Sequence, residues 1–241
     1  MSRDLESSWR DVRARLDAAC AAAGRATDEV RLLPVSKSVD VDAALALHAL
    51  GAREFGENRV DELERKAARF AALGREARWH FIGNLQRNKA RRVVLAADVI
   101  HSVSTPKLLE ALARVAAEEG RRPEIYLEVH LSGEDEKQGF AEDELRDAVA
   151  LAGASHELRL LGLMTMAPRP EPDDVEGRAA RRTFERCAEL ARELATEQPG
   201  SFEGGVAQLS MGMTGDLEQA VAAGSTCVRV GSAIFAAGGD A

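Results

Sequence analysis

Lysine and tyrosine are scarce in this chain of 241 residues. Tyr126 is the single tyrosine, and arginine supplies most of the 32 basic residues. Chemistry that needs a lysine amine or a phenol therefore has few places in this sequence. The five lysines are Lys37, Lys66, Lys89, Lys107 and Lys137.

Cysteines and long apolar runs are also few. Cys20, Cys187 and Cys227 are odd in number and far apart, which predicts free thiols in a reducing, cytoplasmic compartment. No apolar run approaches the roughly 20 residues that cross a bilayer, and the polar N-terminus resembles neither a signal nor a transit peptide. We therefore expect a soluble protein that does not bind membranes.

Patterns for nucleic acid, metal and serine-type chemistry are missing. The net charge of -8 disfavours a nucleic-acid surface, and the basic segment 87–92 is interpreted as a solvated helix face. The histidines lie in separate units without other ligands at metal spacing, and neither G-x-S-x-G nor C-x-x-C occurs. His80 alternates within an aromatic run, which favours a packed, hydrogen-bonded histidine over a general base.

The dominant pattern is a short apolar run followed by a helical stretch, repeated eight times. Such alternation predicts parallel strands joined by right-handed crossovers, and eight units fit a single-domain α/β protein, a (β/α)8 TIM-type barrel over 1–241 with an extra N-terminal helix. A doubly wound sheet is disfavoured because no G-x-G-x-x-G follows an early strand. We expect strands over 30–35, 54–55, 79–82, 99–103, 125–131, 158–164, 207–209 and 227–230, and helices over 2–23, 40–50, 60–73, 85–97, 107–119, 142–152, 175–197 and 217–223.

Among the lysines, only Lys37 directly follows an apolar strand. In a barrel, this position lies at the carboxyl end of the first strand, where active sites are built. A confined, partly dry site would disfavour the ammonium form and make the amine nucleophilic toward aldehydes. The alternative is a surface lysine in a loop.

Two loops rich in small residues follow the last two strands. They cover 210–215 and 229–232, and each leads into a helical segment. Small residues let backbone N–H groups approach an anion, and this fold often binds phosphate in these two loops. The alternative is that the glycines only make tight turns. Asn58, after the second strand, could donate to a ligand oxygen or cap the next helix.

Five ordered motifs resemble the pyridoxal 5'-phosphate homeostasis proteins, single-domain relatives of the alanine racemase barrel. The motifs are LLPVSKSVD, FGENRVDEL, WHFIGNLQRNK, GLMTMAP and LSMGMTGDLEQAVAAGSTCVRVGSAIF. The resemblance extends from about residue 4 to residue 237. It implies that pyridoxal 5'-phosphate is the cofactor and that the protein holds it as a Schiff base.

The resemblance also implies the binding residues. Lys37 would carry the Schiff base, and Asn58 would lie near the cofactor. Arg229 would face the pyridine nitrogen and discourage its protonation, which makes the ring a poorer electron sink. The phosphate would be held by Ser210 and by the backbone of Met211, Gly231 and Ser232.

This chain departs from the family pattern at three places. Arg59 stands where members often have tyrosine, and Val39 where some have a second lysine. The loop usually written Ser-Lys-x-Gly reads Glu136-Lys137-Gln138-Gly139 here, so a glutamate stands in place of the serine. None of these departures changes Lys37 or the phosphate loops. They concern any secondary role in cofactor handling at positions 39 and 137.

Three functions are compatible with a lysine and a phosphate site. The first is a non-catalytic carrier that maintains pyridoxal phosphate homeostasis and passes the cofactor to apo-enzymes. The second is an amino-acid racemase, which needs a tyrosine on the second face of the substrate. Three features speak against it: Tyr126 is expected at the wrong end of its strand, no second domain is expected, and Met166 stands where racemases tend to carry a ring-stacking histidine. The third is a Schiff-base aldolase, which leaves Arg229 unexplained. We favour the carrier, and we expect a monomer.

Overall fold

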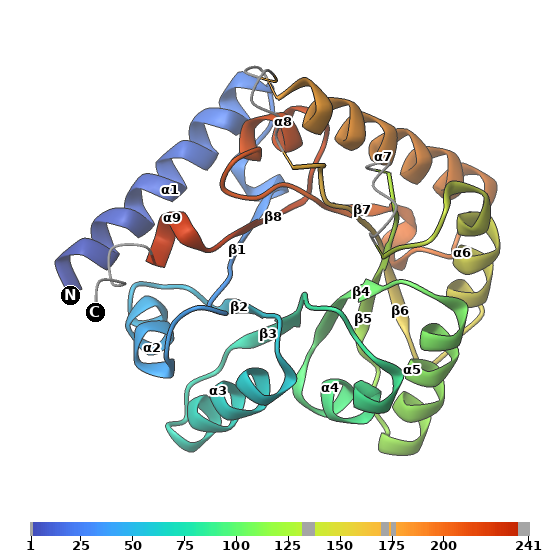
Figure 1. Ribbon diagram of the computed structural model, residues 1–241, viewed down its shortest axis with the longest axis horizontal. Helices are drawn as coiled ribbons and strands as arrows, with labels where there is room; N and C mark the ends of the chain where they lie inside the picture. Colours follow the sequence, from blue (N-terminus) through green and yellow to red (C-terminus); the bar gives the residue numbers. More distant parts are fainter. Residues whose placement is uncertain (1, 132–137, 170–173, 175–176, 236–241) are drawn as a thin grey trace.

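The computed structural model describes residues 2–131, 138–169, 174 and 177–235. Its strands are parallel and pair in the order β1-β8-β7-β6-β5-β4-β3-β2. An isolated parallel bridge between Val35 and Gly56 joins β1 to β2 and completes the ring seen in Figure 1. The predicted barrel is therefore confirmed. Its strands are β1 Arg31–Pro34, β2 Glu54–Glu57, β3 Arg78–Phe81, β4 Val99–Val103, β5 Glu124–Glu128, β6 Arg159–Met164, β7 Gln208–Ser210 and β8 Cys227–Val230.

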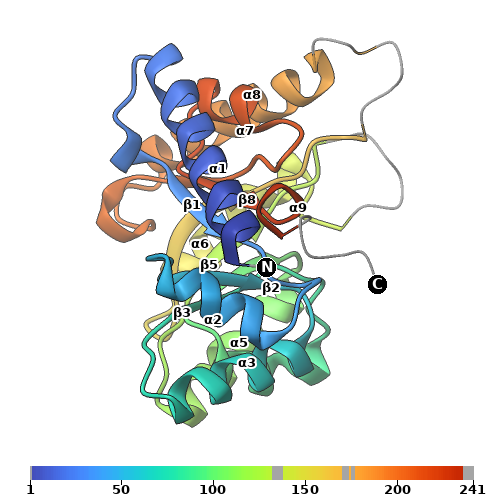
Figure 2. The ribbon, with the colours of Figure 1, turned by 90° about the vertical axis from the view of Figure 1, so that its left-hand side faces the viewer.

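Helices lie outside the ring of strands (Figure 1). They are α1 Ser2–Ala22, α2 Val41–Ala49, α3 Val60–Ala72, α4 Ala90–Ala96, α5 Pro106–Glu119, α6 Leu145–Gly153, α7 Arg178–Glu197, α8 Leu217–Ala222 and α9 Ser232–Phe235. The predicted N-terminal helix is α1, which packs against α8 and α9 (Figure 2). Single 3-10 turns, η2 Arg87–Lys89 and η3 Glu142–Glu144, lead into α4 and α6, where the sequence predicted unbroken helices.

Local signals explain why the chain turns where it does, and α5 shows three of them. Thr105 accepts a hydrogen bond from the Leu108 backbone N–H as the N-cap, and Pro106 occupies the first helical position. Gly120 ends the helix with a φ of 60°, a left-handed conformation that favours glycine. These two ends fix where β4 stops and β5 begins.

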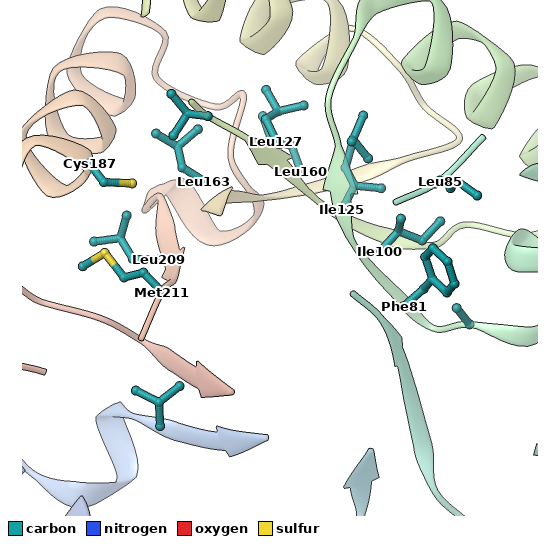
Figure 3. Close-up of a cluster of buried hydrophobic side chains, with 14 of the residues drawn as sticks. Phe81, Leu85, Ile100, Ile125, Leu127, Leu160, Leu163, Cys187, Leu209 and Met211 are labelled. Carbon is teal, nitrogen blue, oxygen red and sulfur yellow. The ribbon is translucent and has the colours of Figure 1, made fainter. Parts of the chain in front are cut away.

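Successive residues of a strand contribute to two different layers, as the pleat requires. Ile125 and Leu127 of β5 lie in the large cluster between strands and helices, with residues such as Leu163 and Leu209 (Figure 3). Tyr126, between them, belongs instead to a small cluster with Val99, Leu161 and Met164 inside the barrel. The pairings of β4 with β5 and of β5 with β6 each contain a register shift, so in β6 it is Leu161 and Met164 that join the inner cluster, while Leu160 and Leu163 lie in the large one.

The remaining sequence expectations concern thiols, metals and membranes. All three cysteines are buried and free, as predicted. In the part of the chain that the structure describes, no helix has the length and apolar character needed to cross a membrane. Within that same part, no group of three or more acidic, histidine or cysteine side chains is arranged to hold a metal ion.

Candidate functional site

Lys37 lies at the carboxyl end of β1, in the turn that follows the Val35 bridge. Ser36 is fully buried, whereas the Lys37 side chain is exposed on the rim. The structure therefore places this lysine at the expected end of the barrel, but in an open position rather than the confined one the sequence suggested. An exposed amine at this rim is accessible to an incoming aldehyde.

A second lysine lies directly beneath this turn. Lys66 of α3 is fully buried, and its Nζ donates to the backbone carbonyl of Ser36 and to Oε1 of Glu57, both at 2.6 Å. The Ser36 hydroxyl donates to the same Glu57 oxygen at 2.6 Å. The sequence predicts that Lys66 lies in a charged helix, but nothing in it indicates that this amine forms a buried ion pair with Glu57.

Arg229 of β8 is the buried cation of the site, and only 6% of its surface is exposed. Its Nη1 donates to the backbone oxygen of Ser210 at 2.6 Å and to the Ser210 hydroxyl at 2.7 Å, and its Nη2 donates to the Thr165 carbonyl at 3.0 Å. Burial lowers the pKa of Arg229, yet a guanidinium keeps its charge at neutral pH. These bonds to β7 and to the residue that follows β6 fix the plane of the guanidinium.

Ser210 and Met211 lie at the carboxyl end of β7, and both are fully buried. The Ser210 hydroxyl is fully buried and bonded to Arg229 and to Nδ1 of His101 at 2.8 Å. The Met211 backbone N–H donates to the Cys227 carbonyl at 3.1 Å, and its carbonyl accepts from the Ser225 hydroxyl. Both residues are thus engaged in holding β7 to its neighbours.

Two hydroxyls in the loops after β7 and β8 belong to Thr214 and Ser232, whose oxygen atoms lie 3.2 Å apart. Ser232 is exposed and begins α9, so the first N–H groups of that helix lack partners within it. Gly231 lies just before it, where a Cβ would come within 3.0 Å of the Val35 carbonyl oxygen, so a side chain would fit there only tightly. The sequence had selected this loop but had not singled out Thr214.

Gly212 sets the course of the loop after β7. Its φ is 95°, and a Cβ there would lie 2.4 Å from Cβ of Ala220 in α8. Such close packing requires a residue without a side chain. Gly212 is therefore a structural necessity, and the loop that it begins brings Thr214 toward Ser232.

Asn58 follows β2 at the same end of the barrel and is partly buried. It is not the cap of the next helix, because the N-cap of α3 is Arg59, which makes no side-chain capping bond. Its backbone is held in place by Gly83 after β3, where an added Cβ would lie 2.0 Å from the Asn58 carbonyl oxygen. The alternative of a helix cap, which the sequence left open, is therefore wrong.

Glu128, at the end of β5, is a titratable group near Arg229 that the sequence did not identify. It is 6% exposed, and burial raises the pKa of its carboxyl to about 7, with the Arg229 charge acting in the opposite direction. Near neutral pH the carboxyl of Glu128 therefore occurs in both its protonated and its ionised form. Nothing in the sequence pattern distinguishes this glutamate from Glu124, four residues earlier in the same strand.

Of the other residues named from the sequence, His80 and Tyr126 are buried, and Lys137 is not described. His80 is fully buried and shares a hydrogen bond of 2.8 Å with His101, so the packed histidine is confirmed. Tyr126 lies in the middle of β5 and donates to Oε1 of Gln208 at 3.1 Å, and burial raises its pKa. Lys137 lies outside the described residues.

Comparison with known proteins places this arrangement in a family. The family model "Alanine racemase, N-terminal domain" matches residues 11–238. A "Pyridoxal phosphate homeostasis protein" from Vibrio cholerae is 36% identical over 97% of this chain and 96% of its own, and one from Deinococcus radiodurans is 40% identical over 90% and 93%.

Solved structures agree with these sequence matches. PipY of Synechococcus elongatus, in a structure described as having PLP bound, has a TM-score of 0.83 and 32% identity, covering 96% of this chain and 99% of its own. An alanine racemase from Clostridium difficile shares the fold at a TM-score of 0.73 and 11% identity, over 97% of this chain and 56% of its own. The chain therefore belongs to the pyridoxal phosphate homeostasis protein family, within the fold of the alanine racemase N-terminal domain.

Proposed function

We propose that this protein binds pyridoxal 5'-phosphate on Lys37 as a Schiff base and holds it for transfer to apo-enzymes, without catalytic turnover. The observation that carries the proposal is the fixed guanidinium of Arg229 at the same barrel end as an exposed lysine. When bound, the cofactor supplies an aldehyde that condenses with an amine and releases water. The family membership and the PLP-bound relative support the same ligand.

The residues present fit this cofactor. Lys37 supplies the amine, and Arg229 supplies a cation for the ring nitrogen, where it would discourage protonation. The phosphate would meet the hydroxyls of Thr214 and Ser232 and the backbone of Gly231 and Ser232. Asn58 would line the site beside Lys37.

Ser210 and Met211 take indirect roles in this proposal. Because the Ser210 hydroxyl and the Met211 N–H already have partners, we assign them to holding Arg229 and the loop after β7 rather than to direct phosphate contact. This refines the expectation from the sequence, in which both residues touched the phosphate.

Absence of turnover is proposed from the position of the single tyrosine. Racemisation through two bases needs a second acid–base group on the far face of the substrate. Tyr126 is fully buried in mid-strand and bonded to Gln208, so it is not available at the rim. Incubation of the loaded protein with L-alanine should therefore produce no D-alanine above the level of a protein-free blank.

The decisive experiment uses two lysine variants. The purified protein is loaded with pyridoxal phosphate, reduced with borohydride and mapped by peptide mass spectrometry. We expect the pyridoxyl group on Lys37, and Lys37→Ala should lose the visible Schiff-base band while keeping its fold. Lys107→Ala is the matched control, because Lys107 is also exposed and lies in the first turn of α5, the helix after β4. An unchanged spectrum for Lys37→Ala would overturn the proposal.

Transfer and assembly are tested separately. The loaded protein is mixed with an apo-enzyme that depends on pyridoxal phosphate, and recovery of that enzyme's activity is compared with recovery from an equal amount of free cofactor.

We also propose a monomer located in the cytoplasm. Light scattering during size-exclusion chromatography gives the mass in solution, to be compared with the 25.9 kDa of the chain.

A further inference from the structure

A line of buried polar groups crosses the barrel interior from β3 to β7. Nδ1 of His80 lies 2.8 Å from Nε2 of His101, and Nδ1 of His101 lies 2.8 Å from the Ser210 hydroxyl. All three residues are fully buried. The line ends at Arg229, which donates to that same hydroxyl at 2.7 Å. A cation at the rim is thus connected to the middle of the barrel by three hydrogen bonds.

Both histidines in this line are neutral. Burial lowers the pKa of each well below the usual value, and nearby arginines lower it further. A neutral imidazole carries one N–H and one acceptor nitrogen, so each ring must adopt one of two tautomers. The groups at the two ends of the line decide which.

The lower end of the line is set by a carboxylate. Nε2 of His80 is buried without a hydrogen-bond partner and faces Oε2 of Glu54 at 3.7 Å. Glu54 is ion-paired with Arg31 at 2.9 Å, so its oxygens are acceptors. An N–H facing this carboxylate is favoured over a lone pair, which places the His80 proton on Nε2 and leaves Nδ1 as an acceptor.

The remaining bonds then follow one direction. His101 donates from Nε2 to His80, so its Nδ1 must accept from the Ser210 hydroxyl. A guanidinium can only donate, so Arg229 uses a lone pair of that same oxygen. The Cys227 thiol also lies beside the Ser210 hydroxyl, but sulfur is the weaker acceptor.

We propose that His101 is a positioning residue for Arg229: its Nδ1 accepts a hydrogen bond from the Ser210 hydroxyl and thereby holds the hydroxyl oxygen in place as an acceptor for the guanidinium. This inference rests on the proposed function, because the orientation of Arg229 acts on the cofactor ring. His101 itself touches no cofactor. With the acceptor nitrogen removed, the Ser210 hydroxyl turns to another partner and Arg229 loses one of its three fixed contacts.

The first test is on the unliganded wild-type protein and needs no variant to fold. Long-range ¹H–¹⁵N correlation spectra at neutral pH distinguish the two neutral tautomers of each histidine. We expect the proton on Nε2 in both His80 and His101. A proton on Nδ1 of His101 would overturn the proposal, whatever the protein binds.

The second test compares three variants in cofactor binding. His101→Phe keeps a ring against Tyr126, on which His101 stacks at 4.6 Å, but removes the acceptor. We expect about three- to tenfold weaker binding of pyridoxal phosphate, the effect of losing one net hydrogen bond, together with a shifted visible spectrum. His101→Asn keeps an acceptor near the position of Nδ1 and should restore most of both properties.

Tyr126→Phe is the matched control, because it removes a buried polar group from the same ring stack without touching the line. It should bind the cofactor with the wild-type spectrum. Equal effects of His101→Phe and Tyr126→Phe, or no rescue by His101→Asn, would show a merely structural role and refute the proposal. A wild-type protein that binds no pyridoxal phosphate would refute the proposed function instead, and the tautomer result would stand apart from it.

Discussion

Replacing Lys66 by methionine gives the most direct test of the internal ion pair below Lys37. Methionine keeps most of the length of the lysine side chain but removes its charge and its donors. Glu57 would then lose its cationic partner, although neither side chain is exposed to water in the wild-type protein. One Glu57 oxygen already lacks a hydrogen-bond partner. The Ser36 carbonyl would lose its bond from Nζ as well.

The expected loss of stability follows from the burial of the pair. Breaking a buried ion pair by removing one partner costs about 3 to 5 kcal/mol. For a chain of 241 residues, this corresponds to a fall in the melting temperature of roughly 6 to 20 °C. Urea unfolding monitored by tryptophan fluorescence gives the free energy directly, since Trp79 is buried beside β2.

A double variant separates charge from packing. Lys66→Met combined with Glu57→Gln leaves no unpaired charge and retains an acceptor for the Ser36 hydroxyl. It should therefore recover at least half of the stability lost by Lys66→Met alone. Lys107→Met, at an exposed position, should change the stability by less than about 0.5 kcal/mol. A loss below about 1 kcal/mol for the single variant, or a double variant as unstable as the single one, would refute the reasoning.

Three further predictions concern the rim. Glu128→Gln should flatten the pH dependence of stability. The folded pKa of Glu128 is about 7 against an ordinary value of 4.5, so its carboxyl makes the wild type lose about 3 kcal/mol of stability as the pH rises through this window. Denaturant titrations from pH 4 to 8 should therefore show the variant gaining stability relative to the wild type, and parallel pH curves would contradict this. Gly212→Ala should cost about 2 to 4 kcal/mol through its positive φ and its clash with Ala220, whereas Gly215→Ala, with open space around it, should be nearly neutral in the same thermal melts. Arg229→Glu should weaken cofactor binding and shift the visible spectrum, because it reverses the charge proposed to face the ring nitrogen; an unchanged titration and spectrum would show that Arg229 is structural.

The barrel was predictable because its signals are local and repeated. The strands 99–103 and 227–230 were expected with the bounds the structure has, since each is a short apolar run between helices. Lys37 could be singled out for a similar reason: it directly follows an apolar strand. The positions of helix ends shifted by only one or two residues where glycine or threonine marks the boundary, as at Thr105 and Gly120.

The parts that could not be predicted depend on pairs distant in the sequence. Lys66 and Glu57 are typical surface residues by type, and only the approach of α3 to the end of β2 buries them together. Likewise, the hydrogen bond between the Ser210 hydroxyl and His101, 109 residues earlier in the chain, could not be predicted, and it is the basis of the indirect role that we propose for Ser210. A single sequence contains no record of such proximity, because it arises from closing the barrel.

The way in which the ring is closed has a consequence for how this protein moves. Between the described strands β1 and β2, the backbone pairing consists of the Val35–Gly56 bridge, with the Ser36 N–H donating to the Gly56 carbonyl at 3.0 Å. Side chains add the contacts of Lys66, the Ser36–Glu57 hydrogen bond and the Arg31–Glu54 ion pair. Local opening should therefore start at this seam, and the Ser36 amide should exchange its hydrogen with solvent sooner than amides in the middle of β5. Because Lys37 is the next residue after Ser36, a ligand attached there would lie beside the seam, and its binding or release should slow or speed the exchange of the Ser36 amide.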